Sequence, residues 1–144
     1  MGKKIYKKSC GVIPVYEQGD KKLFLVIHQN NGHWAFPKGG MEEGESEEKT
    51  ALRELGEEAG IGVSTLMPDS RILEEYDIEE ECGLVLKQVV YFIGLVDGLD
   101  VKIQKEEIQD FAWLSFDKAL ARMTYNSTRR VLRKANDYLL SSNL

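Results

Sequence analysis

The chain has 144 residues and a mass of 16.4 kDa, which suits one domain with its own core rather than two independent domains. Its 42% hydrophobic and 30% charged composition is that of a globular chain and not of a disordered one. The net charge of −5 lacks the basic surplus with which proteins grip a nucleic-acid backbone. We therefore expect a single domain over residues 1–144 with no stable nucleic-acid partner.

Residues 5–16 and 21–29 are rich in β-branched and aromatic side chains, and they flank a polar turn at residues 17–20. This pattern predicts two strands joined as a hairpin. A second turn at residues 30–32 leads into a predicted loop over residues 34–40, whose paired glycines permit backbone conformations closed to other residues.

A helix is predicted over residues 47–59, because both of its ends carry suitable residues. Ser46 is a good N-cap, and Glu47 and Glu48 suit the positive end of the helix dipole. Gly60 provides a C-terminal stop. Within this helix we expect the apolar stripe Leu52-Leu55-Ala59 to pack against the sheet.

The second half of the chain predicts strands first and helices last. Residues 71–78, 84–96 and 111–114 have strand character. Ser115 is placed to cap a short helix through Met123, and the apolar positions of residues 127–140 recur at helical spacing. The order of elements predicts an α+β domain in which helices pack on the faces of a sheet.

The sequence shows no sign of an export signal, a membrane-spanning segment or a cysteine-based site. The longest strongly apolar run, residues 23–27, is far shorter than the roughly 20 residues of a membrane-spanning helix. Lys3 and Lys4 lead into no apolar signal segment. Cys10 and Cys82 are isolated, so neither a disulfide framework nor a thiolate zinc site is predicted. We expect a soluble cytoplasmic protein with no membrane partner.

Three glutamates share one side of the predicted helix. Glu54, Glu57 and Glu58 are spaced i, i+3 and i+4, and like charges at such spacings each cost an isolated helix about 0.2–0.5 kcal/mol. Arg53 can neutralise Glu57, but nothing within the helix is expected to neutralise Glu54 and Glu58. Two interpretations stay open at this point, a solvated acidic face and a site for Mg²⁺, which Mn²⁺ would also fit.

A longer pattern surrounds these acids. Gly39 is followed after five residues by Glu45, and after a further seven by Arg53-Glu54-Leu55-Gly56-Glu57-Glu58-Ala59-Gly60-Ile61. This pattern resembles a complete Nudix box. The resemblance implies an α/β/α sandwich around a mixed β-sheet and metal-dependent hydrolysis of a nucleoside diphosphate linked to another moiety.

The same resemblance implies roles for individual residues. Glu54, Glu57 and Glu58 would bind the metal, and Gly39 would offer a backbone carbonyl. Glu45 and Arg53 resemble a pair that braces the loop and orients a metal-binding glutamate. Outside the box, Glu106 and Glu107 lie where Nudix proteins often have another metal-binding or basic carboxylate. We choose Glu107, six residues before Trp113, against the alternative of an exposed loop acid.

The flanking segments are similar to the diadenosine tetraphosphate hydrolases of the animal and archaeal type, in particular residues 10–13, 32–40, 43–45, 87–91 and 113–114. This resemblance implies a monomer that hydrolyses diadenosine tetraphosphate (Ap4A) to ATP and AMP. His33, Lys38 and Lys87 would then contact the polyphosphate, and Tyr76 and Tyr125 would stack on adenine.

Other substrates and one other function stay open. The Phe36-Pro37 and Gly39-Gly40 forms also occur in Nudix enzymes that act on RNA 5′ ends and diphosphoinositol phosphates. A Nudix domain can also be a nucleotide-sensing or partner-binding module. For Tyr91 and Phe111 we expect core packing rather than a role in the site.

Overall fold

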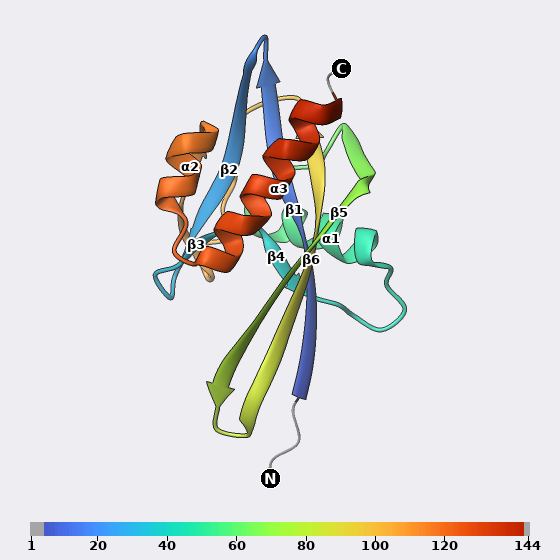
Figure 1. Ribbon diagram of the computed structural model, residues 1–144, viewed down its shortest axis with the longest axis vertical. Coiled ribbons are helices and arrows are strands. Elements are labelled where there is room, and N and C mark those ends of the chain that lie inside the picture. The colour runs from blue at the N-terminus through green and yellow to red at the C-terminus, as the bar shows by residue number, and fades with distance from the viewer. Residues whose placement is uncertain (1–4, 143–144) are drawn as a thin grey trace.

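The computed structural model describes residues 5–142, which form one seven-stranded sheet with helices on both faces (Figure 1). In chain order the elements are β1 (Ile5–Gln18), β2 (Lys21–Gln29), β3 (Trp34–Ala35), β4 (Lys38–Gly40), α1 (Glu47–Ala59), β5 (Thr65–Glu80), β6 (Gly83–Val96), β7 (Ile108–Leu114), α2 (Phe116–Arg122) and α3 (Asn126–Ser142).

The sheet is mixed because β1 and β6 run parallel, with Cys10 opposite Val90, while the other pairings are antiparallel. The strand order is β3-β2-β1-β6-β5, with β4 paired to β1 and β7 paired to β2. The first strand of the chain therefore lies at the centre of the sheet, between β2 and β6.

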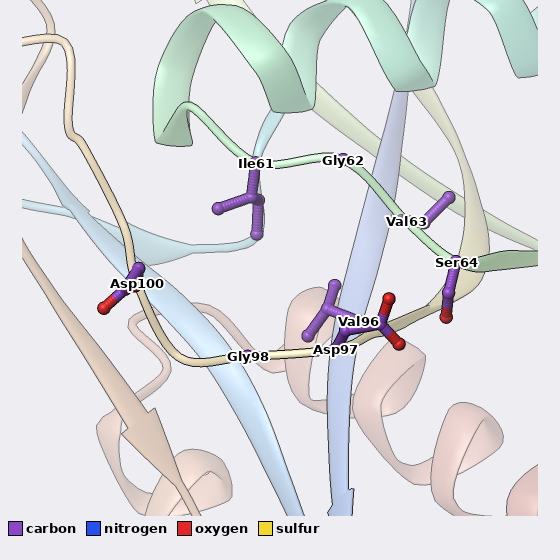
Figure 2. Close-up of a pocket in the computed structure, with 8 residues that line it drawn as sticks. All are labelled: Ile61, Gly62, Val63, Ser64, Val96, Asp97, Gly98 and Asp100. Carbon is purple, nitrogen blue, oxygen red and sulfur yellow. The ribbon is translucent and has the colours of Figure 1, made fainter.

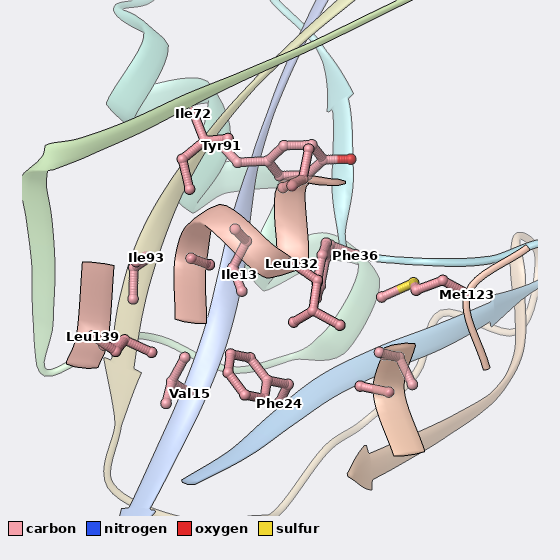
Figure 3. Packing of buried hydrophobic residues seen from close by; sticks show 14 of the residues in the cluster. Ile13, Val15, Phe24, Phe36, Ile72, Tyr91, Ile93, Met123, Leu132 and Leu139 are labelled. Carbon is pink, nitrogen blue, oxygen red and sulfur yellow. The ribbon is translucent and has the colours of Figure 1, made fainter. Parts of the chain in front are cut away.

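Each face of the sheet carries its own apolar cluster. Leu55 and Ala59 of α1 pack with residues such as Val12 on one face. On the other face α2 and α3 cover the larger cluster, in which Leu132 lies among Phe24 and Ile13 (Figure 3). Tyr91 is fully buried in that cluster, and Phe111 packs against the α1 cluster, as predicted. The α/β/α sandwich is thereby confirmed.

Helix α1 begins and ends where the sequence predicts. The Ser46 side chain accepts a hydrogen bond from Lys49 N, and Gly60 has φ 66° and donates from its N–H to Gly56 O. The predicted packing stripe is wrong at Leu52, which is 39% exposed. Thr50 and Ala51 are buried instead, because the apolar face of α1 is rotated toward them.

The remaining differences are local. The predicted loop over residues 34–40 contains β3 and β4, which are too short to show a sequence pattern. Strand β5 begins at Thr65, earlier than predicted, and its pairing with β6 is irregular between Met67 and Ile72. Ser115 occupies the N-cap position of α2, but its side chain makes no capping hydrogen bond.

None of the helices in residues 5–142 is long and apolar enough to cross a membrane.

Candidate active site

Arg53 connects the loop before α1 with the acidic face of that helix. Its guanidinium donates to Glu45 at 2.8 and 3.0 Å and to the Gly40 carbonyl at 2.9 Å. It also donates to Glu54 at 2.9 Å and to Glu57 at 3.2 Å. The expectation that nothing within the helix neutralises Glu54 is therefore wrong, because adjacent side chains can meet when one is a long arginine.

The Arg53 contact also acts on Glu45. These hydrogen bonds hold the pKa of the Glu45 carboxyl down at about 2. Glu45 additionally accepts from Glu42 N and from the Thr50 hydroxyl, both at 2.9 Å. The box residues thus fix the loop over residues 40–46 against the first two turns of α1.

Glu58 is the buried acid of the box. It is 3% exposed, and its carboxylate accepts a hydrogen bond from Lys38 N at 2.8 Å. Burial raises the pKa of Glu58 to about 8, and the neighbouring Glu54 and Glu107 carboxylates add to that rise. Burial likewise raises the pKa of Glu54 above its ordinary value. Burial first, and the neighbouring acids second, therefore disfavour the charged forms of Glu58 and Glu54.

Strand β4 passes very close to α1 at Gly39. A Cβ atom at this position would overlap the Glu54 carboxylate, so a side chain here would displace that carboxylate from its present place. The neighbouring Gly40 has open space where a Cβ would lie. This close approach brings the backbone of β4 to the carboxylates of the helix.

The donor set suits a hard divalent cation. Carboxylates and a backbone carbonyl are oxygen ligands of the kind that Mg²⁺ takes, and a cation would offset the burial and the smaller acid–acid repulsion that raise the pKa of Glu58. As arranged, no three acidic, histidine or cysteine side chains among the described residues are gathered into a ligand cluster. Arg53 instead occupies Glu54 and Glu57, two of the predicted ligands.

A cavity of about 360 Å³, the carboxylate pocket, adjoins Glu58. Glu107 lines it together with Lys38, and a backbone hydrogen bond of 2.8 Å from Asn30 N to Glu107 O holds the Glu107 loop to the end of β2. Glu106 lies in a different hollow, beside Glu57. The structure therefore places Glu107, rather than Glu106, beside the buried acid of the box.

A second cavity of about 280 Å³, the aromatic pocket, brings together all five residues predicted to bind substrate: His33, Lys38, Tyr76, Lys87 and Tyr125. It shares Gln29, Asn31 and Lys38 with the carboxylate pocket. The two pockets therefore adjoin each other along these three residues.

The two aromatic residues of the pocket come from distant elements. Tyr125 precedes α3, and its hydroxyl lies 2.8 Å from His33 Nε2. Trp34 supports this contact, because its backbone N–H donates to the Thr124 hydroxyl at 2.8 Å. Its ring stacks on His28, with the ring centroids 4.5 Å apart. The turn after β2 and the start of α3 are thereby tied together over the pocket.

Sequence reasoning missed several residues that line the two pockets. Gln29 and Asn31 belong to a strand end and a turn, where polar residues carry no signal. Glu74 and Thr128 line the aromatic pocket and are nearly fully buried. Glu74 begins an acidic run over residues 74–81, in which strand alternation turns Glu74 inward and leaves Glu75 exposed.

A separate hollow of about 360 Å³ lies beyond the C-terminal end of α1, between residues 61–64 and 96–100 (Figure 2). Asp97 and Asp100 line it, and none of the predicted site residues does. The adjoining carboxylate and aromatic pockets, which hold the predicted site residues, are therefore the candidate active site.

The chain belongs to the Nudix family. The NUDIX domain model matches residues 6–135, which include both pockets and the box. Together with the complete box, this membership makes the protein a Nudix pyrophosphohydrolase.

The chain is also similar to particular proteins of known activity. The chain is 36% identical to an asymmetrical bis(5′-nucleosyl)-tetraphosphatase of Sus scrofa, covering 93% of this chain and 96% of that protein. It is 27% identical to an RNA pyrophosphohydrolase of Sphingopyxis alaskensis, covering 76% and 77%. Among solved structures, a binary complex of a C. elegans Ap4A hydrolase superposes with a TM-score of 0.78 at 25% identity, covering 94% and 98% of the two chains.

Proposed function

We propose that the protein hydrolyses Ap4A asymmetrically to ATP and AMP with Mg²⁺ as cofactor, in the cytoplasm and as a monomer. The observation that carries this proposal is that the aromatic pocket adjoins the carboxylate pocket, with Lys38 lining both. A dinucleotide needs such a cleft, with aromatic surface for a base at one end and catalytic groups at the other. The likeness to the Sus scrofa tetraphosphatase supports the same substrate.

The substrate's orientation follows from the charges of the cleft. Tyr76 and Tyr125 offer flat faces to an adenine, as stacked aromatic rings do. Lys38, Lys87 and His33 lie in the same pocket and supply donors for the phosphate oxygens. The polyphosphate then extends past Lys38 toward Glu58 and Glu107.

The carboxylate end performs the hydrolysis. Glu54, Glu57, Glu58 and Glu107, with the Gly39 carbonyl, are the groups that would hold Mg²⁺, which supplies charge neutralisation of the phosphate oxygens and activation of water. Arg53 orients Glu54 and Glu57 by its hydrogen bonds. With a cation beside it the buried Glu58 carboxylate would be ionised, and it could then accept a proton from the attacking water. A water oxygen bonds to one phosphorus, the bridging P–O bond breaks, and no covalent enzyme intermediate is needed.

Product analysis in ¹⁸O-labelled water tests the proposal. Incubation with Ap4A and Mg²⁺, and separately with Mn²⁺, should give ATP and AMP in equal amounts, with the label in one of them identifying the attacked phosphorus. Symmetric release of ADP alone would contradict it. Parallel reactions with 5′-triphosphorylated RNA, diphosphoinositol phosphates and other nucleoside diphosphate derivatives test the alternatives, and faster turnover of any of these would replace Ap4A as the substrate.

Binding without turnover is the remaining alternative. Calorimetric titration with Ap4A in the presence of Mg²⁺ or Mn²⁺ measures binding alongside the product assay. If the protein is the proposed enzyme, binding and turnover should both be seen. Tight binding with no product over hours would instead identify a nucleotide-sensing module. The intact box acids make that outcome the less expected one, because each is positioned by a contact in the structure.

A further inference from the structure

Glu74 of β5 is a buried acid that the proposed reaction does not use. It is 4% exposed, and none of the ion pairs among residues 5–142 includes it. Burying a carboxylate without an ionic partner is costly unless hydrogen bonds compensate. Its presence on the wall of the aromatic pocket therefore requires an explanation.

Three hydroxyl groups hold the Glu74 carboxylate in one orientation. The Tyr91 hydroxyl donates to Oε1 at 3.2 Å. Ser127 and Thr128, in the first turn of α3, donate to Oε2 at 2.7 and 2.9 Å. Burial, reinforced by Glu74 itself, raises the pKa of Tyr91 well above its ordinary value, so that this donor keeps its proton. The carboxylate is thus a rigid acceptor attached to β6 and α3.

The aromatic pocket has two different ends. Lys38, on β4, is the residue it shares with the carboxylate pocket, whereas Glu74 and Thr128 belong to the aromatic pocket alone. Strands β1 and β6 separate β4 from β5, so the backbones of Lys38 and Glu74 lie roughly 14 Å apart at about 4.8 Å per strand. Lys38 and Glu74 therefore line different ends of the aromatic pocket.

Glu74 is also placed next to the aromatic faces. It lies two residues from Tyr76, so both side chains project from the same face of β5. Lys87 lies directly opposite Tyr76 on β6. Glu74, Tyr76, Lys87 and Lys38 all line the aromatic pocket, so a base that lies on Tyr76 has the Glu74 carboxylate beside it on the same wall.

We propose that Glu74 is a specificity-determining residue of this subsite, and that its carboxylate accepts a hydrogen bond from the exocyclic amino group of the bound base. A carboxylate offers about four acceptor positions, and the three hydroxyls leave one for the ligand. This inference rests on the proposed function, since it assumes that a nucleotide base occupies the aromatic pocket.

A base without an amino group should bind less well. The acceptor is fixed by three donors and buried, so it cannot turn to water when the ligand offers no hydrogen. Hydrogen bonds to charged groups are stronger than neutral ones, and an unpaired buried acceptor adds its own penalty. We expect a preference for adenine over amino-free purine of about tenfold or more.

The test compares ligands that differ only in that amino group. The values of kcat/KM are measured for Ap4A and for its analogue in which unsubstituted purine replaces both adenines. The Kd values of AMP and purine riboside 5′-monophosphate are measured by calorimetry in parallel. The wild-type protein should prefer the adenine ligand about tenfold in both assays, a comparison that requires no variant to fold.

Two variants assign the preference to the carboxylate. In Glu74→Gln the preference should fall to about twofold or less, because the carboxamide is neutral and presents an N–H₂ group as well as an oxygen. Ser127→Ala is the matched control, since it removes one supporting donor and keeps the carboxylate. Ser127→Ala should weaken the binding of both ligands equally and so preserve the ratio of their affinities, as any merely structural effect would.

The outcomes separate this inference from the proposed function. Equal use of the two ligands by the wild-type protein, or a preference that persists in Glu74→Gln, would overturn the role of Glu74 while Ap4A hydrolysis stands. Absence of Ap4A turnover would overturn the proposed function instead. In that case the ratio of the two monophosphate Kd values decides the inference by itself.

Discussion

Replacing Glu58 by Gln should abolish turnover and stabilise the metal-free protein at the same time. The carboxamide keeps the shape of the side chain and the acceptor for Lys38 N, which lies 2.8 Å away. It removes one negative charge from the proposed metal site, so kcat should fall about a thousandfold or more. The same charge is buried, so its removal relieves a cost of folding.

The size of that cost follows from the Glu58 pKa. Folding raises this pKa from 4.5 to about 8, so the folded protein holds the proton more tightly than the unfolded chain. Between pH 4.5 and 8 unfolding releases this proton, and stability therefore falls as the pH rises. At pH 7 the cost is at most about 3 kcal/mol, at 1.4 kcal/mol per tenfold change in proton affinity. We expect Glu58→Gln to recover about 1–3 kcal/mol.

Urea denaturation in EDTA, followed by circular dichroism from pH 5 to 8, measures this effect. The wild-type protein should lose stability across the range relative to Glu58→Gln. Glu57→Gln is the matched control, because its side chain is 51% exposed and its loss should impair turnover without a gain in stability. The reasoning would be refuted if Glu58→Gln is no more stable than wild type at pH 7. It would also be refuted if the difference in stability between Glu58→Gln and wild type does not change with pH.

Three further predictions follow from other contacts. Gly39→Ala should lower kcat about a hundredfold with the fold intact, because its Cβ displaces a box carboxylate, whereas Gly40→Ala should be nearly silent in the same steady-state assay. Glu47→Gln should cost about 1 kcal/mol at pH 6, since hydrogen bonds from Arg71 lower the Glu47 pKa to about 2. That difference should shrink as the pH falls below 4.5 and vanish near pH 2 in denaturation curves; a constant difference would contradict it. Tyr125→Leu should raise the KM for Ap4A several-fold with a smaller change in kcat, and an unchanged KM would remove Tyr125 from the subsite.

Local signals account for the parts of the fold that the sequence predicts. Helix α1 has a capping serine and a left-handed glycine at its ends, and both act within one turn of the helix. By contrast, β3 and β4 exist because β2 and β1 offer them partners, and such pairing leaves no mark in two or three residues. The exposure of Leu52 has the same origin, because the packing of α1 on β1 and β4 decides its rotation.

The residues of the candidate site likewise divide into those that the sequence predicts and those that it does not. The box acids could be found because their spacing on one helix is itself the signal. The grouping of Tyr76 and Tyr125 with the lysines was predicted from resemblance, and the structure does bring them into one pocket. Glu74 could not be found, since its partners Tyr91 and Thr128 come from another strand and another helix. A run of acids in sequence does not show which of its members faces inward.

The parallel pairing of β1 with β6 has a consequence for synthesis of the chain. Strand β1 leaves the ribosome well before its partner β6, because Ile13 pairs opposite Ile93 and Tyr16 opposite Val96. During that interval its apolar residues have only β2 and β4 as neighbours in the sheet. Contacts between such distant segments form slowly, and unpaired apolar strands are prone to aggregate. The nascent chain is therefore most vulnerable before β6 has emerged, and a chaperone would be most useful in that window.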